Sequence, residues 1–213
     1  MDIYASDEEK AEEIKRWWRE NGLSVLMAVL LGIGAFFGGR TWLNYQQMQS
    51  HNAANIYQQV VVLLAEDRLE EAEMGAQELI SNFRRTPYAS FAAVEVAAKA
   101  SDDGDLAMAQ QYLQWAADNA KPEGYAEIAR LRLARLKLSE GDYQAALDIV
   151  SQANLDSFAS LYHELEGDIH VVMGNKQQAQ QAYQTALSLL ALGEPRQNIL
   201  EMKLEDVAVA NES

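Results

Sequence analysis

Three histidines and many acidic side chains are the main candidates for catalysis or metal binding in this chain. Its 213 residues include no cysteine. Without cysteine, no disulfide, thiolate nucleophile or cysteine-ligated metal is available. His163 and His170 are seven residues apart on an expected helix, so they lie about 10 Å apart along its axis, too far to share one zinc ion. No nucleophile-elbow or phosphate-loop motif accompanies them. We therefore predict no enzyme, no metal and no cofactor.

Acidic residues gather beside expected turns, where they would serve as helix caps and first-turn residues. The two groups are Glu70, Glu71 and Glu73, and Asp102, Asp103 and Asp105. An envelope hydrolase is the least favoured function, and it would require a reaction that is lost when His163 is substituted. The formal net charge of −15 also disfavours binding to DNA or RNA, which needs a basic surface.

An uncharged run near the start of the chain, residues 21–39, is long enough to cross a bilayer. Four basic residues flank it on the N-terminal side, and Arg40 alone follows closely. Since orientation follows this bias, the sequence predicts a cytoplasmic tail (1–20), a membrane helix (21–42) and a periplasmic domain (43–213) of a single-pass inner-membrane protein. A cleaved signal peptide is the alternative. The acidic preceding segment and the lack of a small-residue cleavage site favour an uncleaved anchor.

Gly34 and Gly38 share the four-residue spacing that allows another helix to approach closely in a membrane. We therefore expect them to be candidates for packing against a second membrane helix. A plain anchor, in which glycine has no such role, is an equally good interpretation.

Short breaks beyond the span recur with a common motif, Gly-[Asp/Asn]-x-x-x-Ala. It begins at Gly104, Gly141 and Gly174, and a degenerate copy begins at Asp67, giving spacings of 37, 37 and 33 residues. This period is close to the 34 residues of a tetratricopeptide repeat. Glycine would end the first helix of each pair and Asp or Asn would cap the second.

The predicted fold class is therefore all-α: one N-terminal transmembrane helix followed by a tetratricopeptide-like helical-repeat domain, an α-solenoid. It would contain about four helical pairs and a closing helix over residues 196–210. In that closing helix we expect Ile199, Met202 and Val207 to turn inward. The membrane helix is expected to continue directly into the domain, because residues 40–74 contain neither glycine nor proline.

The first helix of each pair lines the open face of such an array, so this face is the candidate protein-binding surface. The predicted residues on it are Phe91, Val94, Ala98, Leu131, Arg135, Leu161, Glu164 and Asp168. For Phe91, Leu131 and Leu161, a place in the core is an equally good interpretation. Arg130, Arg132, Arg135 and Lys137 form the densest basic group, which suits either an acidic partner or surface solubility.

Motifs near both ends of the chain resemble the YfgM family of ancillary subunits of the Sec translocon. They are Met-Asp-Ile-Tyr at 1–4, Lys-Arg-Trp-Trp-Arg-Glu-Asn-Gly at 15–22, Leu-Gly-Ile-Gly-Ala at 31–35 and Met-Lys-Leu at 202–204. The resemblance implies association with the SecYEG channel and with the membrane-anchored periplasmic chaperone PpiD, and it carries no catalytic motif. The expected function is a scaffold that links the channel to PpiD or to emerging chains. The alternative is a regulator that sequesters a cytoplasmic signalling protein through residues 2–13.

Overall fold

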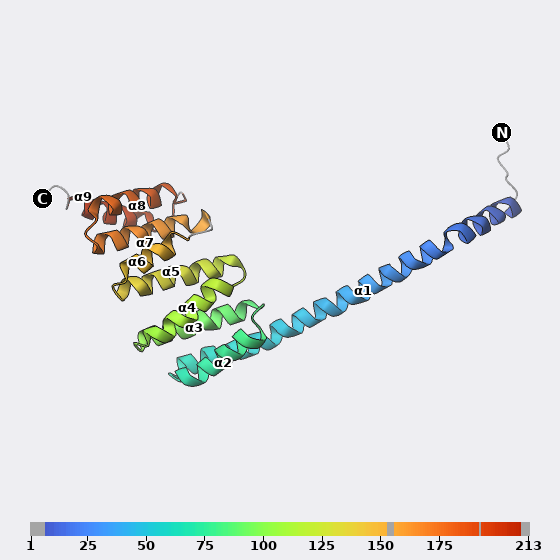
Figure 1. Ribbon diagram of the computed structural model, residues 1–213, viewed down its shortest axis with the longest axis horizontal. Coiled ribbons are helices and arrows are strands. Elements are labelled where there is room, and N and C mark those ends of the chain that lie inside the picture. The colour runs from blue at the N-terminus through green and yellow to red at the C-terminus, as the bar shows by residue number, and fades with distance from the viewer. Residues whose placement is uncertain (1–6, 153–155, 192, 210–213) are drawn as a thin grey trace. The chain divides into compact units, whose positions relative to one another are not determined.

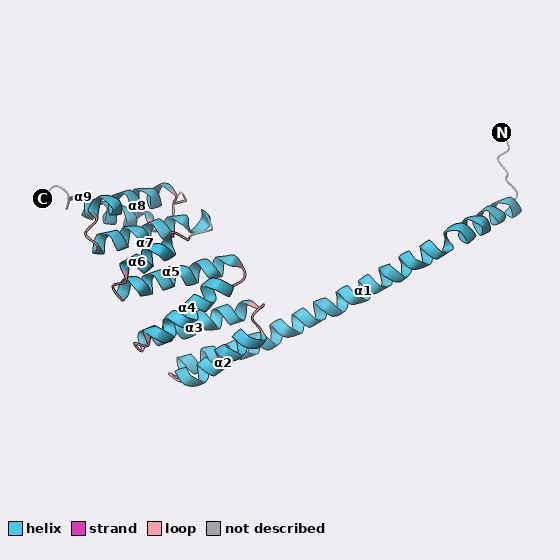
Figure 2. Ribbon diagram, in the orientation of Figure 1, coloured by secondary structure: helices cyan, strands magenta, loops and turns pink. Residues whose placement is uncertain are grey.

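In the computed structural model, residues 7–152, 156–191 and 193–209 are described, and the regular elements among them are all helical (Figures 1 and 2). The elements are α1 (Asp7–Ala65), α2 (Leu69–Asn82), α3 (Pro87–Asp102), α4 (Leu106–Asn119), α5 (Glu123–Ser139), α6 (Tyr143–Val150), the 3-10 turn η1 (Asp156–Phe158), α7 (Ala159–Val172), α8 (Lys176–Ser188) and α9 (Gln197–Val209). The all-α prediction is confirmed.

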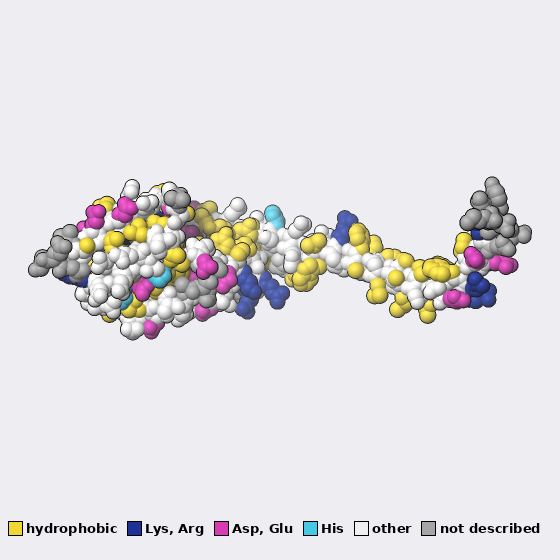
Figure 3. All heavy atoms as spheres, turned by 90° about the horizontal axis from the view of Figure 1, so that it is seen from above, with side chains coloured by type: hydrophobic (Ala, Val, Ile, Leu, Met, Phe, Trp, Pro, Cys, Tyr) yellow, Lys and Arg dark blue, Asp and Glu magenta, His cyan; other side chains and the backbone are white. Residues whose placement is uncertain are grey.

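The chain divides by its contacts into two units, residues 1–49 and 50–213. In the first unit, α1 exposes hydrophobic side chains along its length, with charged groups gathered near its N-terminal end (Figure 3). Within the described residues, α1 is the helix long and apolar enough to cross a membrane, with a mean hydropathy of 2.0 over its most apolar window. The span limits 21–42 and the orientation remain predictions. Residues 1–6 of the predicted tail lie outside the described residues.

The second unit is an array of helical pairs joined by tight turns. Gly104, Gly141 and Gly174 adopt φ angles of +84°, +80° and +77°, and Asp67 takes φ +63° in the degenerate copy. Such left-handed angles favour glycine, so the predicted role of these glycines is confirmed.

The predicted caps are confirmed at two of the three glycine turns. The side chain of Asp105 accepts a hydrogen bond from the Met108 amide at 2.9 Å, and Asp142 accepts one from Ala145 at 3.2 Å. The prediction is wrong for Asn175, whose side chain makes no capping bond. There the backbone oxygen alone accepts a bond, from the Ala179 amide at 3.0 Å.

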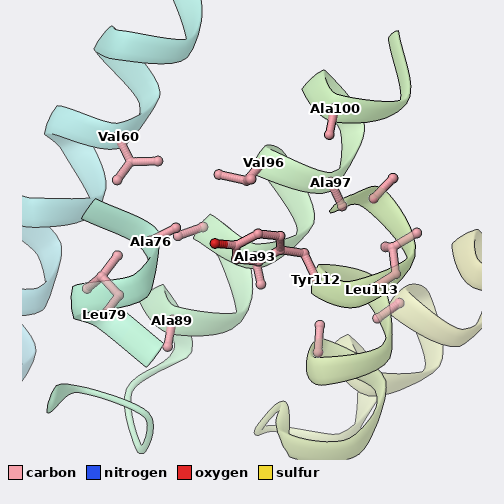
Figure 4. Close-up of a cluster of buried hydrophobic side chains, with 14 of the residues drawn as sticks. Val60, Ala76, Leu79, Ala89, Ala93, Val96, Ala97, Ala100, Tyr112 and Leu113 are labelled. Carbon is pink, nitrogen blue, oxygen red and sulfur yellow. The ribbon is translucent and has the colours of Figure 1, made fainter. Parts of the chain in front are cut away.

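The core between α1, α2, α3 and α4 is built largely from alanine, which lets helix backbones approach closely (Figure 4). Tyr112 reaches from α4 past Ala93 of α3 toward Ala76 of α2 (Figure 4). Its hydroxyl donates to Glu73 Oε1 at 3.1 Å. A single long side chain therefore connects three helices across an otherwise small-residue interface.

A buried carboxylate joins α4, α5 and α7. Glu127 is fully buried, is paired with Arg130, and accepts a hydrogen bond at 2.6 Å from the hydroxyl of Tyr162. Arg130 also donates to the backbone oxygen of Ala117 at 3.1 Å. Burial and the bond to Glu127 raise the pKa of Tyr162 well above its ordinary value, so this hydroxyl remains a donor. Buried charges are tolerated when they are paired in this way.

The closing helix α9 packs on α8 through Leu200, Leu204 and Val207, which meet Tyr183 and Ala186. The inward placement of Val207 is confirmed. The prediction is wrong for Ile199 and Met202, which are 52% and 65% exposed. The buried side chains of α9 are at positions 200, 204 and 207, on one face of the helix. Ile199 and Met202 lie outside this face and therefore point to solvent. Residue 210 lies outside the described residues.

We predict that Gly167→Ala lowers the free energy of unfolding by about 1–3 kcal/mol. An added Cβ would lie 2.3 Å from Cε1 of the Tyr183 ring, which is itself buried between α7, α8 and α9. Thermal and urea unfolding of the full chain in detergent would measure the change. Gly124→Ala is the matched control, because its Cβ would meet Phe158 at an ordinary 3.7 Å. Equal stability of Gly167→Ala and the wild type would contradict this close packing.

Candidate functional site

Three aromatic residues form a row across successive first helices of the repeats. Tyr57 of α1, Phe91 of α3 and Tyr125 of α5 recur at a constant spacing of 34 residues. Their ring centroids lie 5.8 Å apart for Tyr57 and Phe91 and 4.8 Å apart for Phe91 and Tyr125. The first helices of stacked repeats lie side by side, so one aromatic residue from each of them can make a continuous row. We call these three residues the aromatic ladder.

Tyr88 broadens the ladder at its middle. Its ring centroid lies 5.8 Å from that of Tyr57 and 6.1 Å from that of Phe91, with the second pair edge to face. Such tilted and edge-to-face arrangements are the favourable ones for aromatic pairs. The sequence prediction includes Phe91 but misses Tyr57 and Tyr125. Their 34-residue spacing differs from the 37-residue spacing of the turns at positions 67, 104 and 141, so the repeat motif does not find them.

A hollow of about 240 Å³ lies against the ladder and is also lined by Ser90, Val94, Glu95 and Ile128. The structure thus brings together two of the predicted surface residues, Phe91 and Val94, both partly buried. Burial and the nearby Glu95 charge raise the pKa of Tyr57, so its hydroxyl stays protonated. The hollow therefore offers apolar ring surface together with a carboxylate and a hydroxyl.

The basic group on α5 separates into two paired and two unpaired cations. Arg130 binds Glu127, while Lys137 contacts Gln110 at 2.6 Å and Glu140 at 2.8 Å. Arg132 and Arg135 are exposed and make no hydrogen bond or ion pair with any described residue. Both follow Tyr125 on the same helix, about 10 Å and 15 Å farther along its axis.

The predicted acids of α7 are bound within the chain. Arg196 Nη1 lies 2.9 Å from Glu164 Oε2, and Lys203 Nζ lies 2.9 Å from Glu164 Oε1 and 2.7 Å from Asp168 Oδ1. Tyr183 also donates to Asp168 at 2.8 Å. Glu164 and Asp168 therefore hold the closing helix α9 in place and are not free for a partner.

The remaining predicted surface residues divide by exposure. Leu131 is 4% exposed and belongs to the core that also contains Tyr162 and Leu165, so its placement on the binding surface is wrong and the alternative, a place in the core, is confirmed. It occupies the α5 face that packs toward α6 and α7. Leu161 is partly buried against the same core, whereas Ala98 is exposed.

The two histidines on α7 do not converge on a metal site. His163 Nδ1 lies 2.9 Å from Glu166 Oε2, and a hollow of about 570 Å³ beside α6 and α7 is lined by both residues and by His170. Within the described residues, no group of three or more His, Cys, Asp or Glu could hold a metal ion. The expectation of no metal site stays a prediction.

The contacts of Lys203 predict that Lys203→Met lowers the free energy of unfolding by about 1–2 kcal/mol at pH 7. Burial lowers the pKa of Lys203, but the hydrogen bonds that its ammonium donates to Asp168 and Glu164 outweigh burial, so the pKa is raised above the ordinary 10.5. A raised pKa means that this stabilisation is complete below pH 10.5 and is lost as pH rises through the folded-state value. Urea unfolding of both proteins from pH 7 upward would measure the shrinking difference. Lys121→Met, at an exposed position, is the control. Equal stability of Lys203→Met and wild type at pH 7 would contradict this role.

Comparison with known proteins places this geometry in context. The family described as tetratricopeptide repeat-like domain matches residues 15–209. The chain is 28% identical over 201 residues to a Haemophilus influenzae protein named ancillary SecYEG translocon subunit, covering 94% of this chain and 97% of that protein. It is 27% identical over 215 residues to the Escherichia coli protein of that name, covering 98% and 100%. An Aggregatibacter actinomycetemcomitans protein of the same name is 26% identical over 201 residues, covering 94% and 97%.

Proposed function

The chain belongs to the tetratricopeptide repeat-like family, and its resemblance to the YfgM ancillary subunits holds along its length; from this premise we propose that it associates with the SecYEG channel as a non-enzymatic scaffold. The observation that carries the proposal is the near end-to-end match with relatives named as translocon subunits. The match includes both the candidate membrane helix and the repeats. A partial match to the repeats alone would support only the fold.

The proposed topology places the N-terminus in the cytoplasm and the repeat domain in the periplasm. It is supported by the basic residues before the apolar stretch of α1 and by Trp17 and Trp18 there, with Trp42 and Tyr45 after it. These aromatic side chains suit the two interfacial layers of a bilayer. The 20-residue tail would then face the cytoplasm and residues 43–213 would face the exit side of the channel.

The proposed role of the repeat domain is to hold a polypeptide, either the chaperone PpiD or a chain that emerges from the channel. The aromatic ladder and its hollow support this role, because exposed ring surface on a rigid helical array suits a side chain of a partner. Tethering to the same membrane raises the effective concentration of such a partner, so a modest groove affinity is sufficient.

Deletion of residues 50–213 provides the first test of this function. We expect the tagged wild-type chain, extracted in mild detergent, to co-purify with channel subunits and PpiD. We expect the shortened chain to lose PpiD. Retention of both partners after the deletion would contradict the scaffold role. Recovery of a cytoplasmic signalling protein on a peptide of residues 2–13 alone would favour the alternative function, a regulator that sequesters such a protein.

The glycine face of the span gives a separate prediction about the channel. Gly34→Leu with Gly38→Leu should reduce recovery of channel subunits severalfold while leaving membrane insertion intact, because close approach of another helix needs small residues. Neither position has an atom within 4 Å of an added Cβ, so α1 itself tolerates the change.

The chain offers a matched control for that pair. Gly32→Leu with Gly39→Leu adds the same bulk, again without a neighbour within 4 Å. At ~100° per residue these two positions lie on another face, on average about 130° around the helix from Gly34 and Gly38. Equal recovery for the two double variants would assign no role to the Gly34 face.

A further inference from the structure

The starting observation is a pair of unmatched arginines in a strongly acidic protein. The formal net charge is −15, yet Arg132 and Arg135 have no carboxylate partner within the described part of the chain. Several other cations of the repeat domain are paired, among them Arg68 with Glu66 at 2.8 Å and Lys99 with Asp103 at 2.7 Å. Arg85 and Lys121 are also exposed without an ion pair among the described residues, but they lie in the loops before α3 and α5 and not on a helix face. An exposed arginine surrounded by so much negative charge is available to a partner's carboxylate.

Three acids of α5 and α7 are already bound by cations other than these arginines. The next first helix along the array, α7, carries Glu164 and Asp168, but both are bound by Arg196 and Lys203 at 2.7–2.9 Å. The buried acid of α5 itself, Glu127, is bound by Arg130. These three acids are therefore bound by other cations.

The arginines share one face of α5 with the end of the aromatic ladder. Tyr125 and Ile128 line the hollow, and Arg132 and Arg135 follow them at positions +7 and +10 from Tyr125. At ~100° per residue these four positions cover about a quarter of the helix circumference. The opposite flanks of α5 are closed by buried residues such as Leu133 and Ala134. The open face is thus apolar in its N-terminal half and basic in its C-terminal half.

We propose that this face binds an acidic polypeptide segment, in which an aromatic or large aliphatic side chain enters the hollow and Asp or Glu side chains bind Arg132 and Arg135. This inference rests on the proposed polypeptide-binding role of the groove and names its ligand. The hollow of about 240 Å³ is suited to one side chain rather than to a whole small molecule. Guanidinium groups bind carboxylates through paired hydrogen bonds, which adds geometric selectivity.

Glu95 determines where the acids of the segment lie relative to the side chain in the hollow. This carboxylate lines the hollow beside Phe91 and Val94, so it repels an acid placed near the apolar side chain. The acids of the segment therefore lie over the C-terminal half of α5, about 10–15 Å from that side chain along the helix. About four residues of extended chain cover this distance.

The test uses the full chain in detergent micelles and fluorescein-labelled synthetic peptides. Each peptide has one Phe and two Asp residues separated by four Gly or Ser residues, in both chain orders. Matched peptides replace Asp by Asn, or Phe by Ala. Fluorescence anisotropy gives the dissociation constants. We expect one chain order of the Asp peptide to bind at least about tenfold more tightly than both matched peptides, with the preference over the Asn peptide falling at high salt.

Arg132→Gln with Arg135→Gln should weaken binding of that peptide about tenfold or more and leave the Asn peptide unchanged. The matched control is Arg85→Gln with Lys121→Gln, which removes two exposed cations from the loops before α3 and α5. This control should change the affinity less than about twofold. An equal loss in the two double variants would overturn the inference, because it would reflect net charge alone.

Failure of the inference is distinguishable from failure of the proposed function. If the wild-type chain binds Asp and Asn peptides equally, the inference is wrong even where the chain still co-purifies with the channel. If it prefers the Asp peptide but does not co-purify with channel subunits, the proposed function is wrong and the ligand assignment stands.

Discussion

Close approach of helices at small residues is the constraint on which the rest of this structure depends. Ala97, Ala134 and Gly167 occupy equivalent buried positions before the three turn glycines, and the space at Gly167 is filled by Tyr183. Helices that meet at alanine or glycine have few alternative registers, because a shift would bring larger side chains into the contact. A fixed register keeps equivalent positions of successive repeats side by side. The aromatic ladder crosses these aligned helices, and each of its residues lies three positions farther from its own turn than the one before it.

The parts of the fold that depend on local chemistry could be predicted from the sequence. Gly104, Gly141 and Gly174 mark turns because their left-handed backbone suits glycine, whatever surrounds them. The parts that depend on neighbours could not. Leu131 and Met202 both belong to amphipathic helices, and only the packing of adjacent helices decides that the first is buried and the second exposed. The burial of Glu127 likewise has no local signature. Its partner Arg130 is a helix neighbour three residues away, but Tyr162 meets it only in the folded array.

In the candidate site too, some features follow from local sequence and others depend on neighbouring helices. Phe91 could be placed on the open face from helix periodicity, but the hollow beside it depends on Tyr57 and Tyr125 from two other repeats. The repeat motif gave no signal for these two residues, because their 34-residue spacing from Phe91 differs from the 37-residue spacing of the turns at positions 67, 104 and 141. The sequence also contained no signal for the pairing of Glu164 and Asp168 with the closing helix. Because of that pairing, the acids of α7 are bound within the chain, whereas Arg132 and Arg135 of α5 are not.

The most direct test of the account is photo-crosslinking in intact cells from a probe at Tyr125, at the exposed end of the ladder, compared with a probe at Glu78, an exposed position on the second helix α2. The account predicts that the Tyr125 probe yields adducts with a periplasmic chaperone or an emerging chain and that the Glu78 probe does not. Adducts of equal yield from both positions, or adducts to cytoplasmic proteins alone, would contradict a polypeptide-binding groove on the periplasmic side of the membrane.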